Sequence, residues 1–485
     1  MSLLTYLIFV PVLSAALVAS LPQGQARLIA LLSAIITFLL SAFLLTGVSG
    51  TSDFVWVQKS AWIPAVGINF QVGVDGPSAL LILLTTLLGL AAIATPFKLY
   101  AGKKKVYFAS LLLLEATLIG AFSSLDLVLF YVFFEACLIP VWFLMGVFGG
   151  PGATKAMMKF FLYTVMGSLV MLSSILWLGI HFKSFDYTVI QEGLAKSPTL
   201  GTLGVLLLLG FATAFSVKTP LFPFHSWQPE TYAACPSAGV VLVSGAMAKL
   251  GTYGFYRFCL GLFPDASEKV APLFIGLAVV GIVYGALVAA MQRDIKRLIA
   301  YSSISHLGFV VMGIFSGTAQ GISGGLLQMI NHGITTGGLF LILGIIEEQT
   351  GTLKIRALGG LWDRMPVFSR LFLILTLSSI ALPLTNGFVG EFLILLGTFQ
   401  TFPAAAMVAT TGVIWSAVYM LWMFQRVVYG APHDTNKTLT DVTGLPRIVL
   451  SLLVLLVFAL GLFPNTCLSI INFSLPATQV ARSEP

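Results

Sequence analysis

A small set of ionisable side chains lies inside long apolar stretches of this sequence. An ionised group at mid-bilayer costs at least ~2.5–3.5 kcal/mol on insertion scales, so such residues are rare in membranes and usually pair, face water or carry protons. The set, with the histidines that accompany it, comprises Glu115, Glu135, Lys218, Lys249, Glu391, His225, His306 and His332. Carboxyl, amine and imidazole groups all exchange protons, so the set predicts a proton path across a membrane.

Glu135 and Lys218 are the first candidate pair. Glu135 has apolar neighbours on both sides, and Lys218 directly precedes a proline-containing run. A carboxylate beside an ammonium lets both groups ionise, and separation of the two leaves a desolvated lysine that readily gives up a proton. The pair could therefore act as a switch. A purely structural ion pair is the alternative, although buried pairs contribute little to stability.

Lys249, His306 and His332 predict the middle of the path. Lys249 follows the small residues that begin at Ser244, and small residues permit close helix approach. His306 and His332 lie in hydroxyl-rich stretches, and imidazole relays protons through either ring nitrogen near neutral pH. For either histidine alone, the alternative is a structural role in the core, with its ring nitrogens hydrogen-bonded to neighbouring groups. Haem ligation is disfavoured because the sequence has no haem-attachment motif.

The elements that must position these residues are transmembrane helices. The 485-residue chain is 58% hydrophobic and 9% charged, with a mean hydropathy of +0.99, which is the composition of a polytopic membrane protein. With about 20 apolar residues per span, we predict an all-α fold of fourteen helices. Their approximate ranges are 3–20, 27–47, 77–97, 106–124, 126–148, 157–180, 201–224, 236–262, 271–291, 298–316, 321–346, 370–397, 401–428 and 446–470. The apolar start lacks a basic n-region, so we expect the mature protein to begin at Met1.

Two of the predicted helices contain prolines at mid-membrane. The seventh carries Pro220 and Pro223, and the twelfth carries Pro383. Proline removes a backbone donor and clashes with the preceding turn, so each helix should break, leaving free amides and carbonyls. Ordinary proline kinks are the alternative. His225 follows the first break, and Glu391 follows the second on the outer side, where it suits an exit.

Matched breaks indicate inverted repeats with the transport site at their interface. We expect the repeats to be helices 4–8 and helices 9–13. The corresponding regions are 1–105 (helices 1–3), 106–262 (first repeat), 263–428 (second repeat) and 429–485 (helix 14 and tail).

The formal charge of +7 comes from basic residues scattered between apolar runs, so it indicates membrane orientation and not nucleic-acid binding. Seventeen basic residues lie in odd-numbered connections, and one, Arg482, lies in the tail. The even-numbered connections and helix ends carry five: Lys59, Lys183, Lys196, Arg257 and Lys269. The positive-inside rule then places the odd connections in the cytoplasm and both termini outside. The two basic residues left inside helices are Lys218 and Lys249.

The sequence predicts no metal or redox cofactor in this chain. Its four cysteines, Cys137, Cys235, Cys259 and Cys467, lie far apart and form no C-x-x-C pair, which argues against zinc and iron–sulfur sites. No nucleotide-binding fingerprint occurs either.

Four motifs resemble the antiporter-like membrane subunits of NADH:quinone oxidoreductase, respiratory complex I. They are Phe-Tyr-Val-Phe-Phe-Glu135, Lys218-Thr-Pro-Leu-Phe-Pro-Phe-His225-Ser-Trp227, Met247-Ala-Lys249-Leu-Gly-Thr-Tyr-Gly, and Asp294-Ile-Lys-Arg-Leu-Ile-Ala-Tyr-Ser-Ser-Ile-Ser-His306-Leu-Gly. Within that family, the surroundings of Glu135, the chain length and the glutamate at 391 are similar to the M type, the counterpart of mitochondrial subunit 4.

The resemblance implies a translocase that couples electron transfer from NADH to a quinone such as ubiquinone to proton pumping in the respiratory chain. It implies that Glu135 and Lys218 form the coupling pair, that Lys249 is the central proton carrier and that Glu391 gates release outward. It also implies that NADH, FMN, iron–sulfur clusters and quinone bind in partner subunits. L-type and N-type subunits would be neighbours in a bacterial inner membrane, with both termini of this chain in the periplasm. The alternatives are a subunit of a multi-subunit cation/proton antiporter and a ferredoxin-dependent plastid-type relative.

Overall fold

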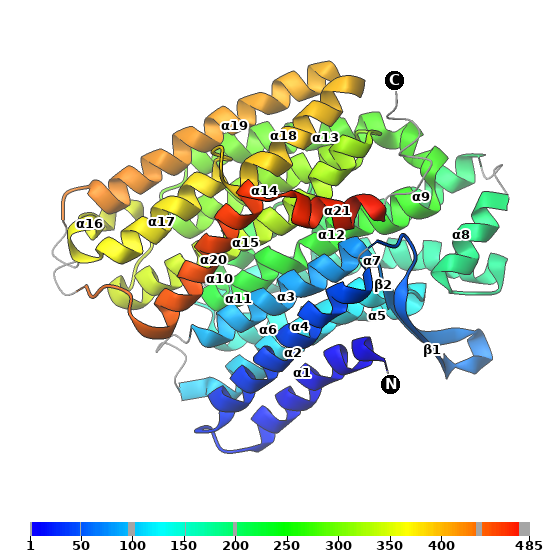
Figure 1. The fold of residues 1–485 in the computed structure, drawn as a ribbon, viewed down its shortest axis with the longest axis horizontal. Coiled ribbons are helices and arrows are strands. Elements are labelled where there is room, and N and C mark those ends of the chain that lie inside the picture. Colours follow the sequence, from blue (N-terminus) through cyan, green and yellow to red (C-terminus); the bar gives the residue numbers. More distant parts are fainter. Residues whose placement is uncertain are drawn as a thin grey trace.

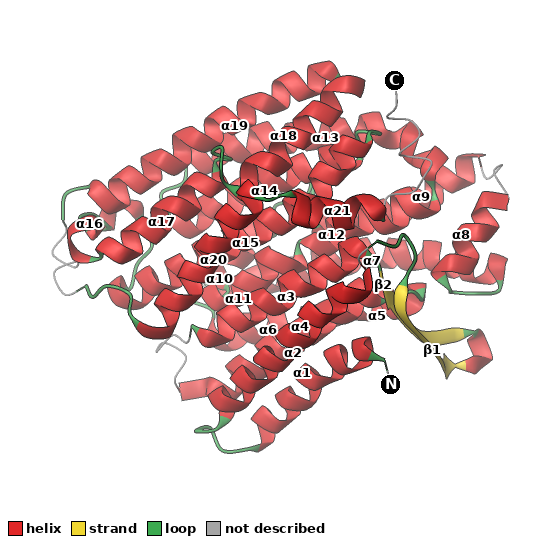
Figure 2. Cartoon of the chain, in the orientation of Figure 1, coloured by secondary structure: helices red, strands yellow, loops and turns green. Residues whose placement is uncertain are grey.

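The structure is a computed structural model that describes residues 2–48, 50–95, 102–150, 152–196, 201–432 and 439–474. Helices make up most of it and run alongside one another in one bundle (Figures 1 and 2). The expected helical membrane fold is therefore confirmed. Lys98, Lys437, Arg482 and the tail after residue 474 were part of the topology prediction and lie outside the described residues.

The N-terminal region holds three helices and a hairpin. They are α1 (Leu3–Ser20), α2 (Ala26–Val48), β1 (Val55–Ile63), β2 (Ile68–Val74) and α3 (Gly76–Ala94). The strands pair antiparallel and project from the side of the bundle (Figure 1). The sequence analysis expected no element here, because the hairpin is too short and too polar to register as a span.

The predicted first repeat comprises nine α-helices among the described residues, some of them fragments of one span. They are α4 (Lys104–Ser123), α5 (Leu127–Ala136), α6 (Leu138–Phe148), α7 (Ala153–Phe182), α8 (Tyr187–Lys196), α9 (Gly201–Lys218), α10 (Gln228–Ala234) and the pair α11 (Ser237–Leu242) and α12 (Lys249–Gly254), which lie in one continuous helix, Ser237–Leu260. Helices α5 and α6 together form the predicted fifth span. π-helical turns at Val243–Met247 and Phe255–Leu260 flank α12, and such turns are frequent at functional sites.

The remaining helices belong to the predicted second repeat and the C-terminal region. They are α13 (Pro264–Ala290), α14 (Ile295–Ile314), α15 (Ala319–Thr350), α16 (Leu361–Arg364), α17 (Pro366–Ser379), α18 (Asn386–Thr401), α19 (Pro403–Phe424), α20 (Gly444–Leu462) and α21 (Asn465–Phe473).

Both predicted breaks are present. Helix α9 ends at Lys218, and helical structure resumes at Gln228. Likewise α17 ends at Ser379, and α18 begins at Asn386. Across the described residues, thirteen helices are long and apolar enough to cross a membrane, and α17 with α18 supplies the predicted twelfth span in two halves. The inverted repeats remain a prediction.

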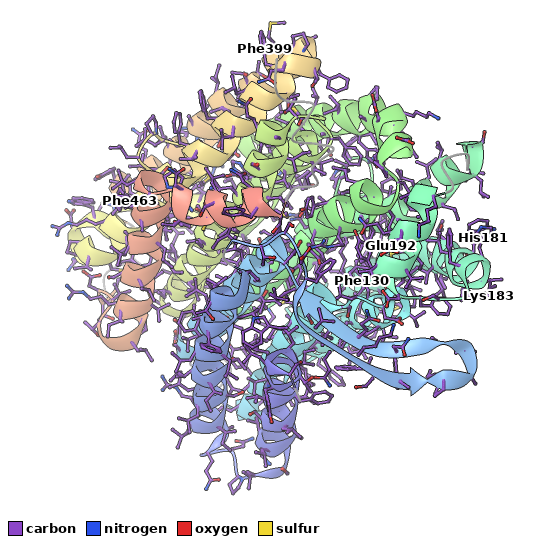
Figure 3. All side chains as sticks on the ribbon, turned by 45° about the vertical axis from the view of Figure 1, so that its right-hand side comes forward. Phe130, His181, Lys183, Glu192, Phe399 and Phe463 are labelled. Carbon is purple, nitrogen blue, oxygen red and sulfur yellow. The ribbon has the colours of Figure 1, made fainter. Side chains whose placement is uncertain are left out.

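Burial separates a central pair of helices from an outer rim of exposed apolar helices. Every residue of Ser237–Leu260 is buried, as is almost all of α15. Most residues of α1, α2, α19 and α20 are not buried, although these helices are strongly apolar. Figure 3 shows exposed apolar side chains on the outside, among them Phe399 on α18 and Phe463 directly after α20. The central pair carries Lys249 and His332.

Candidate functional site

Lys249 and His332 are hydrogen-bonded across the two central helices. The Nζ atom of Lys249 lies 2.7 Å from Nδ1 of His332 and donates to the carbonyl oxygen of Ser244 at 2.6 Å. Two glycines permit this approach, because a Cβ atom on Gly333 would lie only 2.8 Å from the carbonyl oxygen of Gly245. The run of small residues before Lys249 therefore provides the close helix approach that the sequence predicted.

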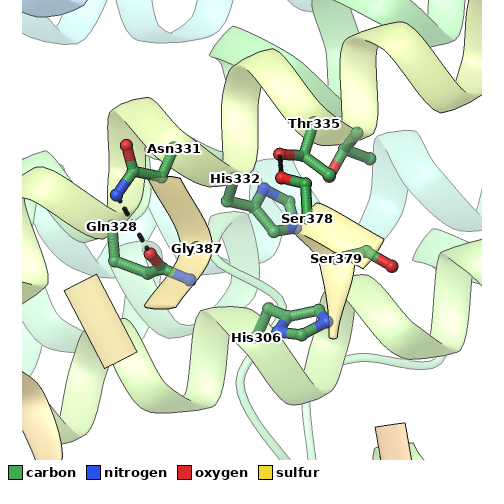
Figure 4. Close-up of a pocket in the computed structure, with 9 residues that line it drawn as sticks. His306, Gln328, Asn331, His332, Thr335, Ser378, Ser379 and Gly387 are labelled. Carbon is green, nitrogen blue, oxygen red and sulfur yellow. Dashed lines mark hydrogen bonds between the residues drawn. The ribbon is translucent and has the colours of Figure 1, made fainter. Parts of the chain in front are cut away.

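His332 is followed by His306 and Glu391. The two imidazole rings lie 5.9 Å apart between centroids (Figure 4). Nδ1 of His306 lies 2.8 Å from Oε1 of Glu391, and Gln328 donates to the same oxygen at 3.1 Å. Helices α12, α14, α15 and α18 thus bring Lys249, His306, His332 and Glu391 into one line, which we call the Lys249–Glu391 line.

A small polar cavity lies beside both histidine rings. Its volume of about 20 Å³ has room for about one water molecule. The lining residues are His306, Gln328, Asn331, His332, Thr335, Thr336, Ser378, Ser379 and Gly387 (Figure 4). Hydrogen-bonding groups therefore surround the space next to the two rings.

Asparagine side chains tie α15 to the break in the twelfth span. Asn331 donates to the carbonyl oxygen of Asn386 at 2.7 Å, and Asn386 donates back to that of Asn331 at 3.3 Å. Ser378 donates to Oδ1 of Asn386 at 2.7 Å. These bonds satisfy backbone carbonyls at the break, as a membrane interior requires.

Gln328, Asn331 and Asn386 were not among the residues predicted for the site. A signal for the first two was available, since Gln328, Asn331, His332 and Thr335 recur at the spacing of one helix face. Asn386 carries no such local signal.

Lys218 and Glu135 lie close in the chain fold without forming an ion pair among the described residues. Nζ of Lys218 donates to the carbonyl oxygen of Phe134 at 3.3 Å and to Sγ of Cys137 at 3.1 Å, and it lies 4.5 Å from the centre of the Phe134 ring. These acceptors flank Glu135, whose Oε1 has no hydrogen-bond partner in the described part of the chain. The ammonium is therefore held by neutral groups beside the carboxyl group.

His225 and Glu115 lie apart from the Lys249–Glu391 line. The ring of His225 packs against Phe222 and Tyr284, and no hydrogen bond joins it to the other candidate residues within the described ranges. Glu115 is fully buried on α4, where the hydroxyl of Thr37 donates to it at 2.8 Å.

The sequence-based count of buried cations was incomplete, because it left out Arg257. It was assigned to a connection or helix end, but it lies within Ser237–Leu260 and is only 7% exposed. Its side chain turns inward to Asp75, with Nη2 2.5 Å from Oδ2. A partner so distant in the chain could not be identified from local charge patterns.

No group of three or more metal-binding side chains occurs in the described parts of the chain. The bundle and its buried line define a class: polytopic membrane proteins with an internal series of proton-exchanging groups. A family model described as NADH:quinone oxidoreductase/Mrp antiporter, transmembrane, matches residues 124–416, and the chain belongs to this family.

Individual relatives agree with that assignment and confirm the predicted resemblance. The chain is 40% identical to NADH-quinone oxidoreductase subunit M of Rhodobacter capsulatus, over 97% of this chain and 95% of that protein. It is 34% identical to a chain of respiratory complex I from Thermus thermophilus with bound NADH, with a TM-score of 0.89 and coverage of 98% and 99%. A chain of the Mrp complex from Dietzia sp. DQ12-45-1b shares the fold, with a TM-score of 0.85, 22% identity, and coverage of 97% of this chain and 52% of that one.

Proposed function

We propose that this chain is the M-type proton-translocating membrane subunit of NADH:quinone oxidoreductase. The observation that carries the proposal is the Lys249–Glu391 line, in which proton-exchanging groups from four helical segments meet inside the bundle. The identity to subunit M of Rhodobacter capsulatus supports the assignment to this complex, whereas the likeness to the Mrp complex concerns the fold alone.

The geometry suits a relay in which each imidazole takes a proton on one nitrogen and releases it from the other. The Lys249 ammonium passes a proton to Nδ1 of His332, 2.7 Å away. Nε2 of His332 and Nε2 of His306 have no hydrogen-bond partner among the described residues. Both rings line the same cavity, and the proton passes through it from His332 to His306. Nδ1 of His306 then passes the proton to Glu391, which Gln328 holds in position.

Glu135 and Lys218 would couple this relay to the rest of the complex. A charge change in a neighbouring subunit closes or opens the pair, and the altered field moves the proton on Lys249. Two unit charges brought to about 4 Å interact by ~4 kcal/mol at an effective dielectric constant of about 20. That exceeds the ~2.3 kcal/mol needed to move one charge against 100 mV, so the switch is strong enough.

The electron-transfer chemistry belongs to the partners in this proposal. NADH, FMN, iron–sulfur clusters and quinone bind in other subunits, and L-type and N-type subunits flank this chain in a bacterial inner membrane. The positive-inside rule orients both termini toward the periplasm. His225 would serve the inner part of the path near the break after Lys218.

The test is Lys249→Ala in the intact complex, with Lys196→Ala as a matched control, because Lys196 is a surface lysine whose side chain is 79% exposed. Proton pumping is followed with a pH-sensitive dye in inverted vesicles during NADH oxidation. Lys249→Ala is expected to abolish pumping and Lys196→Ala to leave it intact. Normal pumping by an assembled Lys249→Ala complex would rule out the relay.

Co-purification separates the proposed complex from a cation/proton antiporter. The native assembly is expected to contain flavin and iron–sulfur subunits and to oxidise NADH with quinone. Sodium-dependent transport by an assembly without redox partners would assign the chain to the antiporters instead.

A further inference from the structure

A second series of polar residues begins at Lys249 and runs along the helix that carries it. Lys249, Tyr253 and Arg257 are spaced four residues apart and so share one face of Ser237–Leu260. Nε of Arg257 donates to the Tyr253 hydroxyl at 3.1 Å, and that hydroxyl donates to the carbonyl oxygen of Phe122 at 3.2 Å. From Lys249, polar side chains therefore lie in two directions: along the line to Glu391, and along this helix face, which ends at Arg257.

Arg257 is enclosed at the end of this face. Its guanidinium carbon lies 4.9 Å from the ring centre of Phe54, 5.4 Å from that of Tyr253, 5.5 Å from that of Tyr256 and 5.8 Å from that of Tyr187. These rings come from three separate parts of the chain. They surround the cation and leave little room for water beside it.

Asp75 completes the enclosure without offering a carrier. Its Oδ2 contacts Arg257, and its Oδ1 accepts the backbone N–H of Ser78 at the start of α3. Asp75 is 3% exposed. Both carboxylate oxygens are thus engaged, one by a permanent cation and one by a helix N-terminus.

We propose that Arg257 is a fixed positive charge that closes the end of this helix to protons, so that a proton on Lys249 leaves only toward His332 and Glu391. The inference rests on the proposed function of the Lys249–Glu391 line. Arginine does not deprotonate in proteins, so it cannot relay a proton, and its charge repels one. An arginine excludes protons from water-conducting pores by the same electrostatic means.

A structural role alone would be a weak reason for this pair, because buried ion pairs contribute little to stability. The two roles differ in one measurable property. A structural pair controls folding, whereas a barrier controls the passive proton permeability of the assembled complex.

The test neutralises both partners together, as Arg257→Gln with Asp75→Asn, so that no unpaired charge stays buried. The whole complex is reconstituted in liposomes without NADH, a pH gradient is imposed, and its decay is recorded with an internal dye. The leak is expected to rise about tenfold, which corresponds to a barrier lower by ~1.4 kcal/mol.

Two further variants make the result specific. Lys59→Gln with Asp186→Asn neutralises another ion pair, of 2.7 Å, which joins β1 to the loop before α8, and is expected to leave the leak unchanged. Adding Lys249→Ala to the Arg257/Asp75 variant is expected to return the leak to the wild-type level, because the escaping proton passes through Lys249. A wild-type leak in the neutralised complex, or a leak that persists without Lys249, would overturn the barrier.

Arg257→Lys provides a test if the neutral pair does not assemble. Lysine keeps a cation beside Asp75 but can lose its proton, so this variant is expected to leak more than the wild type. A wild-type leak there would contradict the need for a non-titrating charge. Failure of the barrier is distinguishable from failure of the relay, since pumping by Lys249→Ala is measured with Arg257 intact.

Discussion

Gly245 and Gly333 set the distance between the amine of Lys249 and the ring of His332. A Cβ atom at position 333 would lie 2.8 Å from the carbonyl oxygen of Gly245 and 2.6 Å from Cδ2 of Leu84. Backbone cannot rotate away as a side chain can, so the central helices would have to separate. The proton transfer that begins the relay thus depends on two residues that have no side chain.

Gly333→Ala is accordingly expected to lower proton pumping and to destabilise the subunit by roughly 1–3 kcal/mol, the usual range for overpacking. Pumping in vesicles and the thermal inactivation of the purified complex measure the two effects. Gly276→Ala is the control, because no atom lies within 4 Å of the added Cβ there. Equal behaviour of the two variants would show that the glycine contact does not set the geometry.

Glu391 and Glu115 offer a second matched comparison at the residue scale. Both are buried glutamates, but only Glu391 contacts a histidine. Glu391→Gln keeps the size of the side chain and removes its ability to take a proton, so pumping is expected to be lost in an assembled complex. Glu115→Gln is expected to retain pumping. Loss of pumping in both variants would place Glu115 on the path as well.

At the scale of elements, the broken helices were predictable and the hairpin was not. Pro220 and Pro383 disturb their helices locally, so the sequence alone locates both breaks. A transmembrane span needs a long apolar run, and Gln58, Lys59 and Ser60 interrupt the apolar residues of β1, although its β-branched and aromatic residues favour a strand.

The site was only partly predictable for a related reason. Residue types and helix positions identify Lys249, His306, His332 and Glu391 as members of one path. Their order and distances depend on which helices pack together, and that information is spread over the whole chain. For the same reason the sequence suggested an ion pair for Lys218, whereas the structure holds its ammonium against a carbonyl and a sulfur atom.

The hairpin is anchored by a pH-sensitive contact. Lys59 on β1 pairs with Asp186, which precedes α8, at 2.7 Å. Burial raises the pKa of Asp186, but hydrogen bonds from Lys59 and Thr188 outweigh it and hold the pKa below its ordinary value. Because the pKa is lowered in the folded state, the ion pair stabilises the fold at pH values above the ordinary pKa of aspartate. That stabilisation is lost as the pH falls through the folded-state pKa.

Amide protection factors in β1 and β2 are therefore expected to fall below about pH 4, near the ordinary pKa of aspartate. Asp186→Asn should lower protection at neutral pH and remove this pH dependence. Lys183→Gln, at an exposed lysine of the same connection, should change neither. Hydrogen exchange read by mass spectrometry measures all three, and an unaltered pH dependence in Asp186→Asn would exclude the anchor.

At the scale of the whole molecule, basic residues gather around a cavity at one end of the bundle. A cavity of about 640 Å³ at the ends of α13, α14 and α15 is lined by five basic residues and two acidic ones. The basic residues are Arg293, Lys296, Arg297, Lys354 and Arg356. These five residues belong to the odd-numbered connections, which the positive-inside rule is expected to hold in the cytoplasm.

Single cysteines test that orientation. All four native cysteines are buried, so they give a low background. Lys354→Cys is expected to react with a membrane-impermeant maleimide only from the cytoplasmic side, and Lys196→Cys only from the periplasmic side. The opposite pattern would invert the topology and with it the direction of proton release.

The small cavity beside His306 and His332 also bears on which ions can pass. Its volume of about 20 Å³ matches about one water molecule, far less than a sodium ion needs with its hydration shell. A proton can cross this cavity by transfer from one hydrogen-bonded group to the next, while the groups themselves stay in position. In the proposed relay, the tight packing around these rings would thus favour protons over hydrated alkali cations by size.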